Sequence, residues 1–432
     1  MSYLSDIKIR TIVLIFLVIT QASLHGIDRT LARRLPPEHA DVRTQFIDYV
    51  DAPLVELFRL REVQRQSRES LVNIRIWVED NPTHVYLVTV PELDSEFPVY
   101  SAGSYILRRR RDNGQINQLK IFLRSDPGFF VRIQPEREDR SRMSVFVAGV
   151  EVYSGIPVPM GIPLLMETRL SRLLDVTDSF VDWEVFFPDI DSNDYRATEI
   201  MANRAREALH TLPDAEDGAM DENGNLVFIE SLVLQDQQPG FNCSGFAKWI
   251  VDGLYMGRYG SFLSIEALKQ KHLDLRGHQW SEPREDDRDP YFGLDWTRNL
   301  ATAVLSAESG GVDVHPEAAD VRQVEFARYI EDVGYPVSQI GQIMYSLAVA
   351  EPGRFYLASL NREFGSQPRL NQHVHVAVLF PYFTPDGTFR TVVLERNVES
   401  SIDSLLSRYE NDHIHLVRIE AHGSYSPPVI RN

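Results

Sequence analysis

The spacing of apolar residues changes near residue 190 of this 432-residue chain, and no other feature constrains the fold as strongly. Between residues 71 and 187, apolar side chains mostly recur at every second position, which is typical of strands that bury one face. Beyond this point helical spacing appears, first in Tyr195–Leu209. The sequence therefore predicts an α+β protein in two parts: residues 36–190, with a small all-β domain, and residues 191–432.

The all-β domain is expected to be a sandwich or a barrel of short strands. Its clearest turn is Asn113-Gly114, which separates two apolar runs, because both residues tolerate the positive φ of a two-residue hairpin. A helix is expected over Phe46–Gln66, ahead of the first strand. Further strands are expected at His84–Val90, Phe129–Ile133, Ser144–Val152 and Asp182–Phe187.

Four consecutive arginines, Arg108–Arg111, adjoin the predicted hairpin. Such a run would suit a patch that binds an anionic wall polymer. Charged side chains also protect an edge strand from pairing with another chain. We favour the edge-strand interpretation.

The second part combines helices and strands. Helices are expected at Tyr195–Leu209, Phe246–Tyr255, Trp296–Ser306 and Val321–Asp332. Leu226–Ile229 is a short apolar segment, and strands are expected at Phe355–Leu360, Val374–Pro381, Phe389–Glu395 and His415–Ile419. Residues 276–290 are very polar and are expected to form an inserted loop within a longer insertion at 260–350.

The first 22 residues have the composition of a signal peptide. Lys8 and Arg10 precede an apolar run, Thr11–Ile19, that is too short to cross a bilayer comfortably. Small residues up to Ala22 would suit cleavage there. We expect export to the periplasm or cell envelope, without stable membrane insertion once residues 1–22 are removed. An anchor that stays uncleaved is the alternative.

The net charge and the cysteine content limit the functions that the protein could have. The formal net charge is −18 at pH 7, and such a field repels nucleic-acid backbones, so nucleic acid is a poor candidate partner. Cys243 is the only cysteine. Exported proteins normally use cysteines in pairs, as disulfides, and an unpaired thiol is open to oxidation. The lone cysteine is therefore either buried and inert or reactive.

The residues around Cys243 favour a reactive thiol. Pro239-Gly240 interrupts regular secondary structure just before Cys243. From Phe246 onward, apolar residues recur at helical spacing. Cys243 is therefore expected at a helix N-terminus, where unpaired N–H groups and the helix dipole stabilise an anion. Such a position lowers the pKa of a thiol, and the same N–H groups can hold an oxyanion. Gly245 leaves room for a substrate or a backbone segment.

The segment Phe241-Asn-Cys-Ser-Gly-Phe246 resembles the signature of the NlpC-type cysteine peptidases, bacterial cell-wall hydrolases with a reduced papain-like fold. In that family an aromatic residue, Asp, Cys, Ser and Gly open the catalytic helix, and Asn242 stands here in place of the Asp. The resemblance covers about residues 195–400. It implies a papain-like catalytic domain over residues 191–432, with Cys243 as the nucleophile and peptide amides of peptidoglycan stem peptides as the substrate.

The same resemblance implies a histidine on a later strand. His375 stands at the family's position and would act as the base. His373 is the reserve candidate, and in a regular strand the two side chains would point the same way. His413 and His415 form a second His-x-His pair. We interpret that pair as structural, because no third metal ligand with suitable spacing is evident.

A third residue should orient the imidazole by accepting a hydrogen bond from it. In this family it comes from the next strand, which is expected over Phe389–Asn397, and Glu395 or Asn397 could reach His375. The sequence does not distinguish the two. No cofactor motif is present, so we expect an exported cysteine peptidase or amidase that uses neither a cofactor nor a metal.

Two other functions fit the same residues. One is a non-catalytic envelope protein that binds the wall or another protein through its β domain and retains a degenerate papain-like domain. The other is an amidase or transferase activity on the same scaffold. Rapid reaction of Cys243 with a thiol reagent near neutral pH would favour an enzyme over a scaffold.

Overall fold

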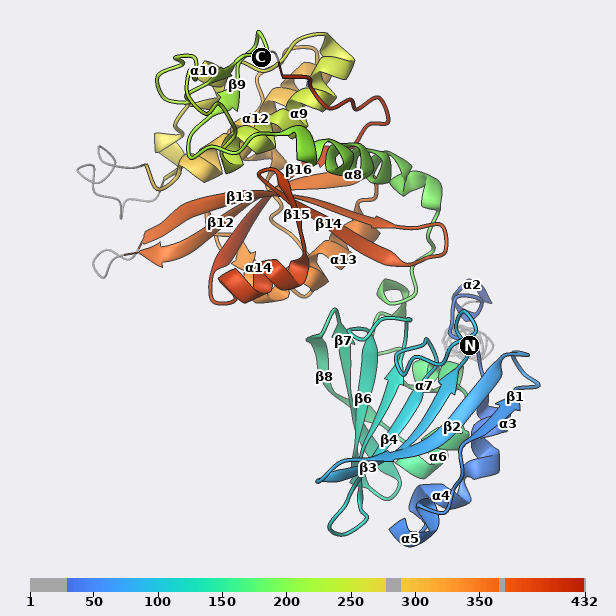
Figure 1. Cartoon of the computed structure of the whole chain (residues 1–432). Coiled ribbons are helices and arrows are strands. Elements are labelled where there is room, and N and C mark those ends of the chain that lie inside the picture. Colours follow the sequence, from blue (N-terminus) through green and yellow to red (C-terminus); the bar gives the residue numbers. More distant parts are fainter. Residues whose placement is uncertain (1–28, 277–288, 365–369, 431–432) are drawn as a thin grey trace, which may run out of the picture. The chain divides into compact units, whose positions relative to one another are not determined.

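A computed structural model of the chain describes residues 29–276, 289–364 and 370–430. The chain divides into two compact units, with the boundary between Asp189 and Ile190 (Figure 1). The expected signal segment, residues 1–22, lies outside the described residues, as does most of the polar loop 276–290. None of the helices formed by the described residues combines the length and the apolar character needed to cross a membrane.

The first unit is built on one antiparallel sheet of eight strands, which pair in chain order. The strands are β1 (Val63–Gln66), β2 (Asn73–Asp80), β3 (His84–Pro91), β4 (Tyr105–Arg110), β5 (Ile116–Phe122), β6 (Phe130–Arg137), β7 (Arg140–Val147) and β8 (Val150–Val158). Among the described residues β1 does not pair with β8, so the sheet is an open meander. Asn113-Gly114 lies in the predicted turn between β4 and β5.

Helices accompany this sheet, so the prediction of an all-β domain is wrong. They include α3 (Ala40–Arg43), α4 (Asp48–Asp51), α5 (Leu54–Leu57), α6 (Ile162–Glu167) and α7 (Leu170–Thr177). Helix α6 contacts β6, and α7 contacts β8. One face of the sheet is buried with α6 and α7 in the core, which includes Leu119, Val131 and Val145.

Three element predictions in this unit are also wrong. The helix expected over Phe46–Gln66 is interrupted at Pro53, which forces the preceding residue out of helical geometry. The strand expected over Ser144–Val152 is divided by a turn in which Ala148 has φ 47°. The strand expected over Asp182–Phe187 is replaced by a short 3₁₀ turn.

The arginine run Arg108–Arg111 does not lie on an edge strand, because β4 is paired on both sides, by β3 and β5. The edge-strand interpretation is therefore wrong. Arg109 turns inward and donates to Gly114 O at 2.7 Å and to Ala52 O at 2.7 Å. The run is thus divided between the two faces of the sheet rather than forming a single patch.

The second unit carries a six-stranded antiparallel sheet in the order β11-β16-β12-β13-β14-β15. Its strands are β11 (Tyr335–Pro336), β12 (Arg354–Phe364), β13 (Leu370–Phe383), β14 (Phe389–Glu395), β15 (Val398–Ser400) and β16 (His413–Glu420). On one side of the sheet lie α8 (Arg196–Ala208), α9 (Cys243–Tyr259) and α12 (Phe292–Glu308) (Figure 1). On the other side lie α13 (Ile340–Ala350) and α14 (Ile402–Tyr409) (Figure 1).

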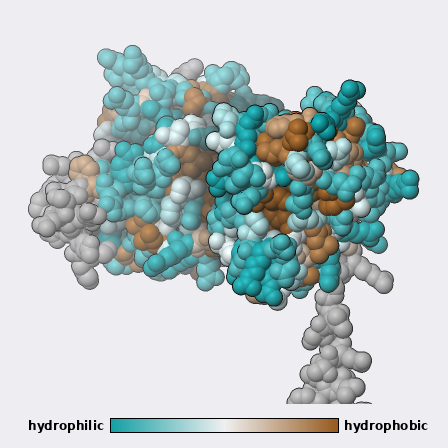
Figure 2. Space-filling view, turned by 90° about the horizontal axis from the view of Figure 1, so that it is seen from below, coloured by the Kyte–Doolittle hydropathy of each residue, from teal (hydrophilic) through white to brown (hydrophobic). Residues whose placement is uncertain are grey.

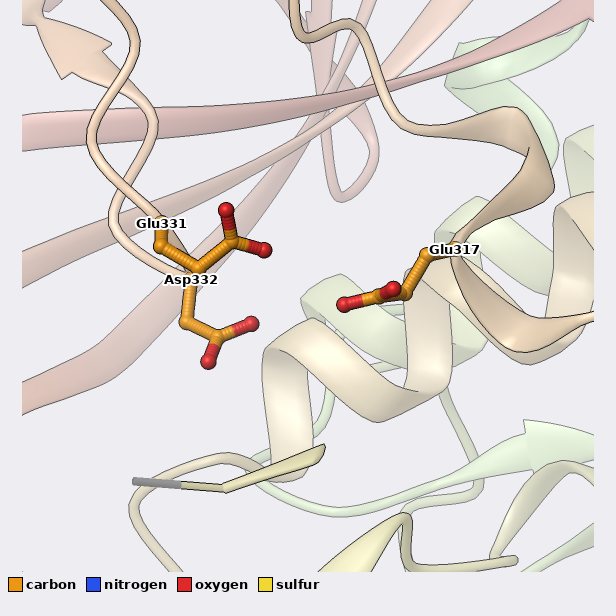
Figure 3. Close-up of side chains that lie close together, drawn as sticks. All are labelled: Glu317, Glu331 and Asp332. Carbon is orange, nitrogen blue, oxygen red and sulfur yellow. The ribbon is translucent and has the colours of Figure 1, made fainter. Parts of the chain in front are cut away.

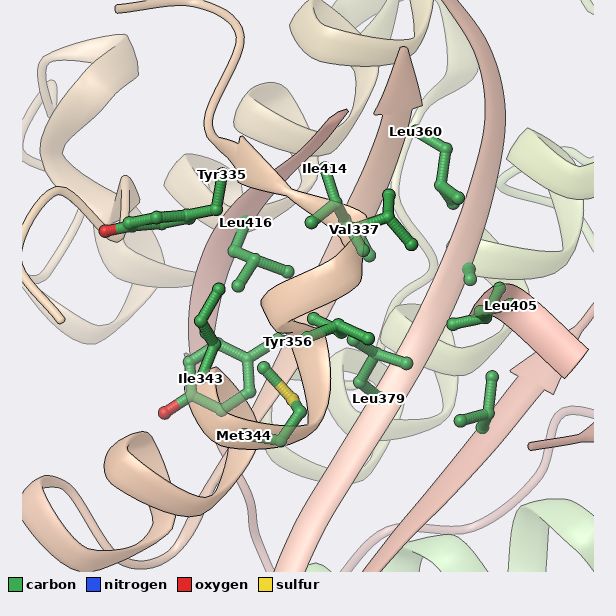
Figure 4. Close-up of a cluster of buried hydrophobic side chains, with 14 of the residues drawn as sticks. Tyr335, Val337, Ile343, Met344, Tyr356, Leu360, Leu379, Leu405, Ile414 and Leu416 are labelled. Atoms are coloured by element: carbon green, nitrogen blue, oxygen red, sulfur yellow. The ribbon is translucent and has the colours of Figure 1, made fainter. Parts of the chain in front are cut away.

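A continuous core joins the sheet to α13 and α14. Figure 4 shows Ile343 and Met344 of α13 packed against Tyr356 and Leu379 of the sheet, with Leu405 of α14 beside them. All of these side chains are fully buried. The core fixes β13 and β14 relative to α14, and the candidate active site is assembled from these three elements and the start of α9.

Most element predictions in this unit are confirmed, including the helices that correspond to α8, α9 and α12 and the strands that correspond to β12, β13, β14 and β16. The helix expected over Val321–Asp332 is wrong. Phe326 has φ 63° and Asp332 has φ 56°, values that an α-helix excludes. The unit is mixed α/β with a large antiparallel sheet. Figure 2 shows a largely hydrophilic surface interrupted by apolar patches.

Candidate active site

Cys243 is the first residue of α9. Asn242 caps this helix, because its side-chain oxygen accepts a hydrogen bond of 2.8 Å from the N–H of Gly245. The thiol therefore lies at the N-terminal end of a helix, where the helix dipole favours an anion. The neutral amide of Asn242 supplies the cap without placing a negative charge beside the sulfur.

Two close contacts fix the start of α9. A Cβ at Gly245 would lie 1.9 Å from Gly218 O, so only glycine lets the helix approach the segment that leads into β9 (Ala219–Met220). On the other side, Trp296 of α12 donates from Nε1 to Ser244 O at 2.9 Å. Gly245 therefore makes room for the protein's own backbone, one of the two roles expected for it.

His375 of β13 hydrogen-bonds the Cys243 thiol. Its Nε2 donates to Glu395 Oε2 at 2.7 Å, which leaves Nδ1 for the thiol. Its ring also stacks on Tyr409, the last residue of α14, with 6.2 Å between centroids and 12° between ring planes. The imidazole is thus held at Nε2 by the Glu395 carboxylate and on one face by an aromatic ring, with the Cys243 thiol as its other side-chain partner.

The charges of the site favour a thiolate–imidazolium pair. Burial alone would raise the pKa of the Cys243 thiol, but the hydrogen bond and the positive charge of His375 outweigh it, and the pKa falls below its ordinary value. Burial alone would lower the pKa of His375, but its hydrogen bonds to Cys243 and Glu395 raise it to about 9. Because the pKa of the thiol falls and the pKa of the imidazole rises, the proton between them is held mainly by the imidazole.

Glu395 of β14 is the carboxylate of the site. Burial would raise its pKa, but hydrogen bonds from His375, Arg408 and Ser400 outweigh burial and lower the pKa to about 2. Arg408 of α14 contacts Glu395 Oε1, so the two carboxylate oxygens have different partners. Glu395 is therefore ionised throughout the physiological range and accepts from the imidazolium.

Cys243, His375 and Glu395 all line one cavity of about 1510 Å³. The remaining lining includes α10 (Ile265–Leu268) and the residues after it, α12, β15 and the start of α14, and it exposes polar and apolar surface in equal measure. Cys243 is partly exposed in this cavity. A substrate group can therefore reach the sulfur, whereas a structural cysteine would be sealed in the core.

His373, the reserve candidate, has a different environment. A register shift pairs His375 with Leu360 but His373 with Asn361, so the regular alternation fails and the two side chains do not point the same way. His373 is bonded to Ser359 Oγ at 2.8 Å and to Asp332 O at 3.1 Å. Burial holds its pKa well below the ordinary value, so it is a neutral, fully bonded structural residue.

Asn397, the alternative third residue, does not contact His375 in the described structure. Strand β14 ends at Glu395, and Arg396, with φ 52°, begins the turn into β15. The Asn397 side chain instead donates to Leu212 O at 3.1 Å. The expected strand over Phe389–Asn397 is two residues too long, and this error placed Asn397 on the same face as Glu395.

The structure adds two residues that the sequence analysis missed, Arg408 and Tyr409. Both come from α14, which lies on the other side of the sheet from α9. Arg408 holds Glu395, and Tyr409 stacks on His375. No pattern in the sequence indicated either residue. Helix α14 is far from Cys243 in the sequence, and only the pairing of the strands in the sheet brings the two together.

A second group of ionisable side chains lies away from this cavity. Glu317, Glu331 and Asp332 point toward one another (Figure 3). Two guanidinium groups neutralise them, since Arg322 pairs with Glu317 at 2.8 Å and with Glu331 at 2.9 Å. Arg298 pairs with Asp332 at 2.9 Å. The group is a network of salt bridges that fixes an irregular segment to α12.

The other His-x-His pair contributes to the same region of the fold. His415 is fully buried and lies 3.2 Å from Tyr329 Oη and 3.4 Å from Asp320 Oδ2. Both partners contact Nε2, and among the described residues Nδ1 is buried without a hydrogen-bond partner. The pair remains most simply interpreted as structural.

The amide at Asn242 leads to a first prediction. The Asn242 side-chain nitrogen lies 3.5 Å from Asp217 Oδ1, so an aspartate at position 242 would meet a carboxylate as well as the thiolate. Asn242→Asp is therefore expected to raise the pKa of Cys243 by roughly one unit. The pH dependence of alkylation by iodoacetamide measures this shift. Asn242→Ser, which keeps a neutral cap, is the control, and equal profiles for the two variants would contradict the prediction.

Fold and site together define an α/β protein with a cysteine, a histidine and a glutamate assembled at a cleft. Residues 33–185, which lie in the first unit, match a family described as a domain of unknown function (DUF8515). No curated protein and no solved structure matches the chain. The unit that carries Cys243 therefore has to be interpreted from its own residues.

Proposed function

We propose that the protein is a cysteine hydrolase that cleaves amide bonds through a thioester intermediate. The observation that carries the proposal is the Cys243–His375–Glu395 arrangement, in which the pKa of the thiol is lowered and the pKa of the imidazole is raised. A structural cysteine needs neither shift. The arrangement also lies in an open cavity, where a substrate can approach the sulfur.

The chemistry follows from the positions of the groups. The Cys243 thiolate attacks the amide carbonyl carbon, and a carbon–sulfur bond forms while the carbonyl electrons move to oxygen. N–H groups at the start of α9 stabilise this oxyanion. The imidazolium of His375 gives its proton to the nitrogen as the carbon–nitrogen bond breaks, and the amine leaves.

Water completes the cycle. His375, now neutral, removes a proton from a water molecule that attacks the thioester carbonyl. The carbon–sulfur bond breaks, a carboxylic acid is released, and the thiolate–imidazolium pair is restored. Glu395 keeps the imidazole oriented and stabilises its charged form in both steps.

For the substrate we propose peptide amides in peptidoglycan stem peptides, hydrolysed after export to the periplasm or cell envelope. The support is the resemblance of Phe241–Phe246 to the NlpC-type signature and the signal-like residues 1–22. A papain-like domain over residues 191–432 is part of the same proposal. The cavity exposes both polar and apolar surface, which suits a peptide with polar amides and apolar side chains.

The direct test is the reactivity of Cys243 toward iodoacetamide as a function of pH. An ordinary thiol with a pKa near 8.5 is only about 1% ionised at pH 6.5. The lowered pKa predicts that the ratio of the alkylation rate at pH 6.5 to the rate at pH 8 is larger for Cys243 in the folded protein than for an ordinary thiol. Because Cys243 is the only thiol, mass spectrometry of the intact chain reports this site alone.

The same chain unfolded in urea is the control, since unfolding separates Cys243 from His375. It should be alkylated slowly at pH 6.5 and faster as the pH approaches 8.5. If the folded protein shows the same dependence as the unfolded chain, Cys243 is not activated. That outcome would favour a non-catalytic envelope protein.

A further inference from the structure

Three basic side chains lie close together on neighbouring strands of the first unit. Lys120 of β5 is directly opposite Arg132 of β6. Arg108 of β4 pairs with Gln118, two residues before Lys120, and so lies diagonally across from the lysine. The residues on either side of Lys120 are buried in the core, so Lys120 points to the opposite face of the sheet.

This arrangement is unfavourable for the protein alone. Like charges directly opposite each other in a sheet destabilise it. Burial lowers the pKa of Lys120, and the charges of Arg108 and Arg132 lower it further. Among the described residues the ammonium contacts only aromatic rings, at 3.7 Å from the Phe130 centroid and 5.2 Å from the Phe122 centroid.

The two arginines have few acidic partners. Arg132 pairs with Glu151 at 3.2 Å and lies over the Phe146 ring at 4.8 Å. Its Nε is buried and has no hydrogen-bond partner in the part of the chain that the structure describes. Arg108 donates from Nε to the neutral Asn117 Oδ1 at 3.0 Å. Within the part of the chain that the structure describes, the three cations therefore have one carboxylate partner between them, and two positive charges have no acidic partner.

We propose that Arg108, Lys120 and Arg132 bind closely spaced phosphate groups of an anionic polymer. Neighbouring strands lie about 4.8 Å apart, so the three cations span roughly 10 Å, and a ligand must place about two negative charges within that distance. Guanidinium forks and a lysine ammonium are both effective phosphate ligands. The aromatic rings beneath Lys120 and Arg132 hold the cations in place before the ligand arrives.

The basic cluster is a local exception in an acidic chain. The chain as a whole carries a net charge of −18, which disfavours non-specific binding of an extended polyanion. Binding is therefore expected to be confined to this cluster and to weaken steeply with salt. The site lies in the first unit and Cys243 in the second, and the inference does not depend on the proposed hydrolase activity.

The test is the binding of fluorescently labelled polyphosphate to the full chain, measured by anisotropy at several salt concentrations. Arg108→Gln/Lys120→Gln is expected to bind at least about tenfold more weakly, with a shallower dependence of log Kd on log salt. Arg140→Gln is the matched control, because Arg140 is an exposed arginine of the same sheet that pairs only at 3.8 Å with Asp139. It should bind like the wild type.

Thermal unfolding separates binding from folding. Removing Lys120 relieves repulsion, so Lys120→Gln is expected to keep or raise the Tm while it weakens binding. Equal affinities of the wild type and the double variant would overturn the proposal. Equally tight binding of poly-glutamate would overturn the phosphate assignment. Binding to phosphatidylglycerol vesicles without binding to polyphosphate would overturn the assignment to a polymer.

Discussion

Cys243→Ala is expected to lower the rate of amide hydrolysis by roughly 10⁴-fold or more, because no other residue can form the thioester. Purified peptidoglycan is the substrate, and the products are identified by mass spectrometry. The wild type should release fragments that end at one type of stem-peptide bond. The variant should release none above the level of a reaction without enzyme.

Two controls test whether the loss of activity is due to Cys243 itself. The wild type alkylated with iodoacetamide should be as inactive as Cys243→Ala, because the chain has a single thiol. Ser261→Ala, an exposed position beyond the end of α9, should retain full activity. Undigested peptidoglycan with the wild type, together with rapid alkylation of Cys243, would reject the wall substrate but leave the activated cysteine in place.

Glu395→Gln is expected to reduce hydrolysis by about 10²–10⁴-fold, since replacing the orienting carboxylate of a triad by an amide has an effect at the upper end of this range. The amide keeps the size of the side chain but removes the charge that stabilises the His375 imidazolium. Initial rates across a range of pH measure both the loss and its cause. Rates rather than end points are needed, because a slow variant can still complete digestion.

The pH profile distinguishes this role from a structural one. In the wild type, activity should rise through the lowered pKa of Cys243 and fall as His375 loses its proton at a pKa of about 9. Loss of the Glu395 charge lowers the pKa of His375, so the falling limb of Glu395→Gln should move to lower pH. A uniform loss at all pH values, without movement of that limb, would contradict the proposed role.

Glu410→Gln provides the matched control. Glu410 directly follows α14 and is exposed, so this variant makes the same change in charge and size outside the site. It should retain the wild-type rate and profile. Asn397→Ala should also retain the profile, because the Asn397 side chain bonds Leu212 O and not His375.

Local patterns in the sequence were sufficient to place Cys243, the proposed nucleophile, at the start of a helix. The Pro239-Gly240 interruption and the apolar helical spacing from Phe246 onward both lie within about ten residues of Cys243, and α9 begins at that residue. The strand of His375 was recognisable for the same reason, since apolar alternation is a local property. Glu395 was one of two candidates, and only the turn at Arg396 separates it from Asn397.

The errors arose where neighbours across the sheet decide the conformation. The register shift between Leu360 and Asn361 separates His373 from His375, although both histidines lie on one strand. The cluster of Lys120 with its two arginines is equally non-local, because it depends on which strands pair. The run Arg108–Arg111 attracted attention in the sequence, yet only its first residue joins that cluster.

The sequence by itself determined the change of architecture near residue 190, the helix that starts at Cys243 and the strand that carries His375, because periodicity and capping act over a few residues. The tertiary structure alone decided which carboxylate meets the imidazole, which helix supports it and which cations converge in the first unit. These contacts join positions far apart in the chain. Strand pairing and core packing, rather than local preference, bring them together.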